Sequence, residues 1–213
     1  MADLVFDCVD ARAERHAVVP TITLVLRISE TNGARVDAIA LRSQIRIEPQ
    51  RRRYSPTEAD GLHDLFGDTS RWADTLKPMQ LTTLSTMVPS FTGAITLDLP
   101  LTFTYDLEIA SSKYFSALED GAIPLLLLYS GTVFNVVDGR MSVEQISWSK
   151  ESSFPLPVPV WRTAVDAHFP NSGWLRLPLE TLAALRDFKT RNALPTWDST
   201  ITALLAETSE PTP

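Results

Sequence analysis

The sequence predicts an α+β fold in which an antiparallel sheet carries a helical insertion and is followed by C-terminal helices. Several stretches alternate apolar and polar residues, which is typical of strands with one face in a core and the other in water. Such one-sided strands favour antiparallel pairing. Helical spacing of apolar residues is concentrated in the C-terminal part of the chain. A two-layer sandwich with helical decorations is the alternative arrangement.

The stretch 95–109 shows the most regular alternation, so we expect the rest of the chain to be organised around it. Its odd positions, from Ile95 to Ile109, are all apolar, and most of its even positions are polar. Pro100 lies on the polar face and has no N–H group. We therefore expect either a break in the strand or an edge position there.

Two hairpins are predicted from turn signals. Asn32-Gly33 lies between alternating stretches at 20–30 and 36–48, which we expect to pair with each other. Asp138-Gly139 follows a strongly apolar strand over 123–137 and precedes a return strand over 141–148.

Two local signals mark the middle of the chain. Ser55-Pro56-Thr57-Glu58 is typical of a helix start, and this helix is expected to end at Phe66, before Gly67. Gly131, inside a predicted strand, indicates a bulge or a close approach of another backbone. The other expected elements are a strand over 79–88 and helices over 113–118, 161–169, 179–191 and 197–205.

The predicted organisation has three parts. Residues 1–155 form an antiparallel β domain with a helical insertion at about 56–76. The proline-rich stretch 154–159 is expected to be a stiff connector. Residues 156–207 form C-terminal helices packed on the sheet, and residues 208–213 form a mobile tail.

Composition excludes several classes of protein. With 44% hydrophobic and 21% charged residues, the chain can build a core. Its net charge of −7 argues against nucleic-acid binding, which needs a basic surface. Cys8 is the single cysteine, so neither an internal disulfide nor a multi-cysteine metal site is expected. No secretory signal and no apolar run of about 20 residues is visible, so we expect a soluble, cytoplasmic protein without membrane insertion.

No catalytic, cofactor or metal signature is visible, so none of these is predicted. The sequence has no Gly-x-Ser-x-Gly elbow and no glycine-rich phosphate loop. Cys8 lies in an apolar stretch and is interpreted as a buried thiol. The histidines His16, His63 and His168 are isolated in sequence. The rival hypothesis is an enzyme whose site is assembled by the fold, and its candidate groups are Arg51, Arg52, Arg53, Asp106, Glu108, Asp166 and His168.

An arginine cluster is the one unusual charge feature. Arg42 and Arg46 precede three consecutive arginines, and the chain then turns acidic. One interpretation is an internal ion-pair network with the acidic residues Glu58, Asp60, Asp64 and Asp68, which we favour because these lie so near. The other is a site for a small anion or an acidic protein surface. The candidate binding residues are Arg51, Arg52, Arg53, Tyr54, Arg71 and Trp72.

Several strings are distinctive: Glu48-Pro49-Gln50-Arg51-Arg52-Arg53-Tyr54-Ser55-Pro56, Arg71-Trp72, Lys113-Tyr114-Phe115 and Ser130-Gly131-x-Val133-Phe134. Together they resemble an uncharacterised actinobacterial family, the domain of unknown function 6084. Genes of this family often lie beside those of uptake [NiFe]-hydrogenases. The resemblance implies a non-enzymatic accessory or assembly protein that binds another protein, for which a hydrogenase component is the candidate. It supplies no catalytic residues.

A second set of features is the apolar strand from Pro124 to Asn135, Phe169-Pro170-Asn171, and Leu194-Pro195 before a final helix. These features bear a fainter resemblance to the export chaperone SecB. This resemblance implies a SecB-like fold, an oligomer, and an exposed apolar groove that binds unfolded or exported chains. An enzyme or small-anion binder with a site near Arg51–Arg53 is the third hypothesis.

Overall fold

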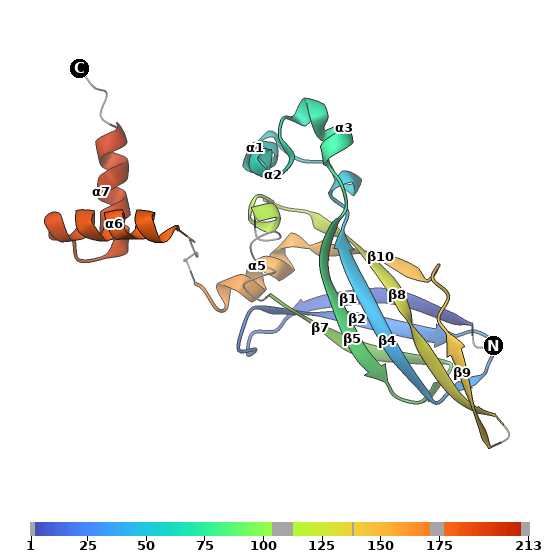
Figure 1. Ribbon diagram of the computed structural model, residues 1–213. Helices are drawn as coiled ribbons and strands as arrows, with labels where there is room; N and C mark the ends of the chain where they lie inside the picture. The colour runs from blue at the N-terminus through green and yellow to red at the C-terminus, as the bar shows by residue number, and fades with distance from the viewer. Residues whose placement is uncertain (1–2, 104–112, 138, 171–176, 210–213) are drawn as a thin grey trace. The chain divides into compact units, whose positions relative to one another are not determined.

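The computed structural model describes residues 3–103, 113–137, 139–170 and 177–209 (Figure 1). The chain divides into two compact units, Met1–Asn171 and Ser172–Pro213, and each is described by itself. Every strand pair is antiparallel, and helices accompany the sheets, so the predicted α+β class is confirmed.

The first unit contains two main sheets. One has the order β1-β2-β7, with β1 (Leu4–Ala13), β2 (Thr21–Glu30) and β7 (Ala94–Thr102). The other has the order β10-β8-β4-β5, with β4 (Ala38–Ile47), β5 (Met79–Val88), β8 (Ala122–Val137) and β10 (Glu151–Pro157), and β9 (Arg140–Gln145) also pairs with β8. The short strands β3 (Arg35–Val36) and β6 (Phe91–Thr92) pair separately.

Most helices of this unit lie in the insertion between β4 and β5. They are η1 (Pro49–Arg51), α1 (Pro56–Gly61), α2 (His63–Phe66), η2 (Thr69–Arg71) and α3 (Trp72–Thr75). Residues 113–116 are also helical, and α5 (Val158–Asp166) follows β10. The expected helix over 56–66 is therefore two short helices, with Leu62 between them.

The two main sheets stack face to face around one core, which is the sandwich arrangement. Figure 1 shows β1, β2 and β7 behind β4, β5 and β8. Phe6 on β1 and Tyr129 on β8 stack across the interior, with ring centroids 4.5 Å apart. Alternate residues of β4, including Ile39 and Ile45, are fully buried. The neighbouring positions of β4 therefore point out of the sandwich.

The predicted pairing of 20–30 with 36–48 is wrong. Strand β2 pairs with β1 and β7, whereas β4 pairs with β5 and β8. The Asn32-Gly33 turn does form, with a positive φ of 76° at Gly33. Because β2 and β4 bury their apolar sides in the same core from opposite sheets, the turn carries the chain across the sandwich rather than back along one sheet.

The stretch 95–109 is not the organising strand. Strand β7 ends at Thr102, residues 104–109 lie outside the described residues, and β7 pairs only with β2 within the described chain. Pro100 thus occupies the predicted edge position. Strand β8 instead pairs with β4 along one side and with both β9 and β10 along the other.

The predictions for the region around β8 are confirmed in outline. Strand β9 returns antiparallel to β8 as expected, although it ends at Gln145 rather than at residue 148. Gly131 has a φ of 142°, and a Cβ atom there would lie 2.1 Å from the carbonyl oxygen of Ala40. The close backbone approach predicted at this glycine is therefore present.

The predicted connector at 154–159 is instead an edge strand followed by a helix. β10 pairs with β8, and its prolines are tolerated because one side of the strand is unpaired among the described residues. α5 buries Val158, Trp161 and Ala164 and contacts β1, β2 and β10. The first unit therefore extends to Asn171, beyond the boundary expected at residue 155.

The second unit contains α6 (Leu179–Arg191) and α7 (Trp197–Ser209), which contact each other. Lys189 Nζ donates to the carbonyl oxygens of Leu194, at 2.7 Å, and Pro195, at 3.1 Å, and so closes the turn between the helices. Because α7 continues to Ser209, the predicted tail is helical at its start, and its last four residues lie outside the described residues. That these helices cover the sheet stays a prediction.

Candidate functional site

The insertion begins with a local structure that its sequence encodes. Ser55 Oγ accepts a hydrogen bond from the Glu58 amide at 3.1 Å, and Glu58 Oε2 accepts one from the Ser55 amide at 3.0 Å. This reciprocal capping box, with Pro56 in the first turn, starts α1 as predicted. It also fixes the Glu58 carboxylate beside Arg52.

Arg52 and Glu58 form a largely buried ion pair. Arg52 Nη2 lies 2.7 Å from Glu58 Oε1, and the two side chains are only 11% and 5% exposed. Arg52 also donates to the carbonyl oxygens of Asp120 and Ala122. Burial raises the pKa of Glu58, but hydrogen bonds from the Ser55 and Glu119 amides and the charge of Arg52 outweigh it and hold the pKa below its ordinary value. The pair fastens the insertion to the segment that leads into β8.

The predicted ion-pair network is confirmed for one of the five arginines, Arg52, which pairs with Glu58. Arg51 pairs instead with Glu48, which lies outside the predicted network: Arg51 Nε lies 2.7 Å from Glu48 Oε2, and Arg51 Nη1 donates to Ser153 Oγ at 3.2 Å. Two of the acidic residues expected in the network pair elsewhere, Asp64 with Lys113 and Asp68 with His63. Arg42, Arg46 and Arg53 have no ion-pair partner among the described residues.

Tyr54 and Trp72, proposed as binding anchors, pack in an aromatic cluster. The Tyr54 hydroxyl donates to the carbonyl oxygen of Pro49 at 2.7 Å and lies 2.8 Å from the hydroxyl of buried Tyr114. Burial raises the pKa of Tyr54. The Tyr54 and Trp72 rings meet edge to face at 5.2 Å, and Trp72 Nε1 donates to the carbonyl oxygen of Gly67. Their first role is to stabilise the insertion.

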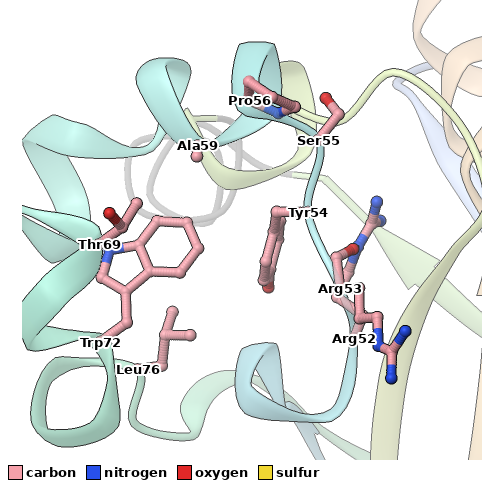
Figure 2. Close-up of a pocket in the computed structure, with 9 residues that line it drawn as sticks. All are labelled: Arg52, Arg53, Tyr54, Ser55, Pro56, Ala59, Thr69, Trp72 and Leu76. Carbon is pink, nitrogen blue, oxygen red and sulfur yellow. The ribbon is translucent and has the colours of Figure 1, made fainter.

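An open pocket of about 500 Å³ lies beside this cluster. Figure 2 shows Trp72 and Leu76 on one side, facing Tyr54, with Arg52 and Arg53 beyond Tyr54. Its lining residues are Arg52, Arg53, Tyr54, Ser55, Pro56, Ala59, Thr69, Trp72 and Leu76. Arg51 instead borders a separate hollow of about 210 Å³ beside β10, and exposed Arg71 lines neither. The fold thus gathers four of the six candidate residues at one pocket of ligand size.

Within the described residues, the side chains proposed for the rival enzyme hypothesis do not come together in one site. Asp106 and Glu108 lie outside them. His168 lies against two backbone carbonyl oxygens, of Ala164 at 2.9 Å through Nδ1 and of Ala17 at 2.7 Å through Nε2, and so links the end of α5 to the β1–β2 loop. Cys8 is buried, as predicted, and its burial raises the pKa of the thiol to about 12.

Two further features are absent from the described ranges, a cluster of metal ligands and a membrane-spanning helix. No group of three or more His, Cys, Asp or Glu side chains could hold a metal ion there. Across the same residues, no helix combines the length and apolar character needed to cross a membrane.

Sequence reasoning missed the outward side of the five-stranded sheet. Here we call it the outer face: the residues of β4, β5, β8, β9 and β10 that point away from the core. At one end it carries an apolar patch, defined by Met87, Phe134, Val136, Met141 and Val143. Strand register places Met141 opposite Val136 and Val143 opposite Phe134, so these side chains share one face.

The exposure of this patch is high for apolar side chains. The exposed fractions are 73% for Met141, 66% for Met87, 59% for Val136 and 55% for Val143. The sequence held a signal, since Met141 and Val143 alternate with polar residues in the predicted return strand. That pattern does not reveal whether the apolar side meets the core or solvent.

Comparisons with known proteins give a family and no function. No curated protein matches the chain. Among solved structures, a β-glucosidase from Kluyveromyces marxianus is similar at 11% identity and a TM-score of 0.25 over 73% of this chain. β-Glucosidase 3B from Thermotoga neapolitana is similar at 13% identity and a TM-score of 0.23 over 72% of this chain. The chain spans only 15% and 17% of their lengths, and these TM-scores support no conclusion on fold or activity.

The family model, in contrast, matches every position, residues 1–213, and the chain therefore belongs to the family of unknown function DUF6084.

Proposed function

We propose that this protein is a non-enzymatic accessory protein that binds another protein through the outer face of its five-stranded sheet. The apolar patch is the observation that carries the proposal. Large apolar side chains on adjacent strands that remain in water are typical of interaction sites. Methionine, present twice, is suited to adapt to a partner's shape.

The contacts of the candidate chemical groups support a binding role over catalysis. Arg52 and Glu58 hold the insertion in place, His168 joins a helix to a loop, and Cys8 is a buried thiol with a raised pKa. The family resemblance makes a component of a [NiFe]-hydrogenase the first partner to test.

A capture experiment tests the proposal. The tagged chain would be purified from its native host as wild type, as the patch variant Met141→Ser with Val143→Thr, and as the control Val9→Thr. Val9 is 52% exposed on β1, close to the exposure of Val143, but it lies on the other sheet. We expect one stoichiometric partner with the wild type and the control, and a loss of at least about tenfold with the patch variant, since interface side chains can each contribute above 1 kcal/mol.

Two results would contradict the proposal. One is recovery of the same proteins in the same amounts by wild type and patch variant. The other is turnover of small substrates by the purified chain in a broad activity screen. Recovery of many unrelated unfolded chains, lost with the patch variant, would favour the SecB-like chaperone role.

The pocket beside Tyr54 and Trp72 supports a second candidate, a small-anion binder. Exposed Arg53 gives this pocket a guanidinium without an ion-pair partner among the described residues, and aromatic carbon forms its walls. Isothermal titration with inorganic phosphate and with benzoate, on wild type and on Arg53→Gln, tests this candidate. Equal heats from both proteins would exclude Arg53 as an anion ligand.

A further inference from the structure

Two arginines continue the outer face beyond the apolar patch. Arg42 and Arg46 lie on β4, in the middle of the sheet, on the same side as Ala38 and Ala40. Arg42 is flanked by the side chains of Ser85 and Ser130. The outer face therefore changes from apolar to basic along its length.

These two cations lack a local counter-charge. Arg46 is flanked by Gln80 and Leu126, and its guanidinium donates to Gln44 Oε1 at 3.4 Å. Neither arginine has an ion-pair partner in the described part of the chain. Across the outward positions of the five strands, Glu151 on β10 is the one carboxylate. Two unpaired arginines on one face stand out in a chain whose net charge is −7.

The size of this surface fits a segment of chain rather than a globular domain. From the Val136–Met141 pair to the level of Arg46 the face spans ten residues, about 33 Å at about 3.3 Å per residue, and four strands at about 4.8 Å spacing make it about 14 Å wide. The product, roughly 460 Å², is well short of the area of about 800 Å² that each partner buries in a standard interface.

A second copy of the chain is a poor occupant. A symmetric dimer through this face would press Arg42 and Arg46 into a surface whose one outward carboxylate is Glu151, and like charges brought together in an interface are unfavourable. A carboxylate-bearing partner gains from the same arginines. Charge complementarity therefore selects an acidic partner.

We infer that the outer face binds one extended segment of a partner protein, with apolar side chains over the patch and a carboxylate over Arg42. This inference rests on the proposed function. Residues that lie opposite one another on neighbouring strands form a row across the sheet. Counted along β8, the row of Phe134 and Val143 lies two residues from the row of Val136 and Met141. The row of Arg42, opposite Ser130, lies four residues further.

An extended segment repeats its side-chain direction every second residue, as the sheet does. The matching segment therefore has apolar residues at i and i+2, a further one at i+4 over Ala40 and Met87, and a carboxylate at i+6. A second carboxylate at i+10 would lie over Arg46. Side-chain contacts alone do not fix the direction in which the segment runs, so either chain direction satisfies the pattern.

A displayed library of random peptides of about 12 residues tests this inference on the full-length chain. The proteins are wild type, the patch variant, Arg42→Ser with Arg46→Ser, and Arg27→Ser. Arg27 is a matched control, because it is an exposed arginine on the other sheet, without an ion-pair partner among the described residues. All the substituted side chains except half-buried Arg46 are exposed, so the variants are expected to fold.

On wild type and Arg27→Ser we expect selected peptides to combine alternating apolar residues with Asp or Glu, enriched at least about threefold over the starting library. The arginine variant should keep the apolar selection and lose the acidic enrichment, and high salt should have the same effect. The patch variant should lose both.

Each of the other outcomes contradicts one part of the inference. Acidic enrichment that persists on the arginine variant refutes the inferred partner chemistry and leaves the proposed function standing. If the wild type selects no peptides, the inferred binding of an extended segment is refuted. The capture experiment then tests the proposed function separately. If the wild type is a dimer and the patch variant is a monomer, a second copy of the chain occupies the face.

Discussion

The buried ion pair between Arg52 and Glu58 makes the sharpest stability prediction, with Glu58→Gln as the perturbation. The substitution keeps the size of the side chain, and the remaining carbonyl oxygen can still accept from the Ser55 amide and cap α1. It removes the charge that neutralises Arg52 and the oxygen that accepts from the Glu119 amide. Because Arg52 is only 11% exposed, water can solvate its guanidinium poorly. Breaking a buried pair in this way typically costs 3–5 kcal/mol. Arg52 retains the carbonyl oxygens of Asp120 and Ala122, so we expect the lower end, about 3 kcal/mol.

Thermal unfolding followed by circular dichroism measures this loss. At about 2–4 °C per kcal/mol, the melting temperature should fall by about 6–12 °C at pH 7. Asp64→Asn is the matched control in the same insertion. Its ion pair with Lys113 is solvent-exposed, so this variant should lose less than about 0.5 kcal/mol.

The pH dependence supplies a second check. The pKa of Glu58 is lower in the folded state than in the unfolded chain, so its stabilisation is fully present above the unfolded value of about 4.3. That stabilisation is lost as the pH falls from there through the folded pKa. The stability difference between wild type and Glu58→Gln should therefore shrink below about pH 4.3. A difference under 0.5 kcal/mol at pH 7, or one that does not depend on pH, would refute the assignment of a buried, charged pair.

Three further predictions concern single positions. Gly131→Ala should lower the melting temperature by about 6 °C or more or prevent soluble expression, because its Cβ would lie 2.1 Å from the Ala40 carbonyl oxygen; an unchanged melting curve would contradict this. Tyr54→Phe should lose about 1–2 kcal/mol in urea unfolding, since the buried Tyr114 hydroxyl loses its partner; no shift of the midpoint would show that the hydroxyl pair is not needed. The Cys8 thiol, with its pKa raised to about 12, should react with a disulfide reagent at pH 8 much more slowly in the native chain than in urea, and equal rates would show that the thiol is accessible.

Features set by short-range chemistry were predictable from the sequence. The start of α1 follows from Ser55, Pro56 and Glu58, which act within one helical turn. The β8–β9 hairpin follows from Asp138-Gly139 between two strand patterns, and the need for Gly131 was visible from its place in an apolar run.

Strand partners and surface roles were not predictable in the same way. Alternation in β2 and β4 reports that each strand buries one face, but not which sheet it joins. Arg51, Arg52 and Arg53 are neighbours in sequence, yet only Arg52 has a largely buried side chain, because Asp120 and Ala122, far along the chain, supply its acceptors. The outer face depends on the same long-range register. The sequence identified four of the pocket's residues but gave no reason to expect Met141 and Arg42 on one surface.

The central place of β8 has a consequence for how the chain folds during synthesis. The first sheet is complete once β7 has emerged, but β4 and β5 then still lack the strand that joins them to β10 and β9. Until Val137 leaves the ribosome, part of the interior must stay open to solvent, since Tyr129 and its buried neighbours on β8 are missing. Closure of the sandwich is therefore a late event, and truncated chains that end before β8 are expected to expose apolar surface and aggregate.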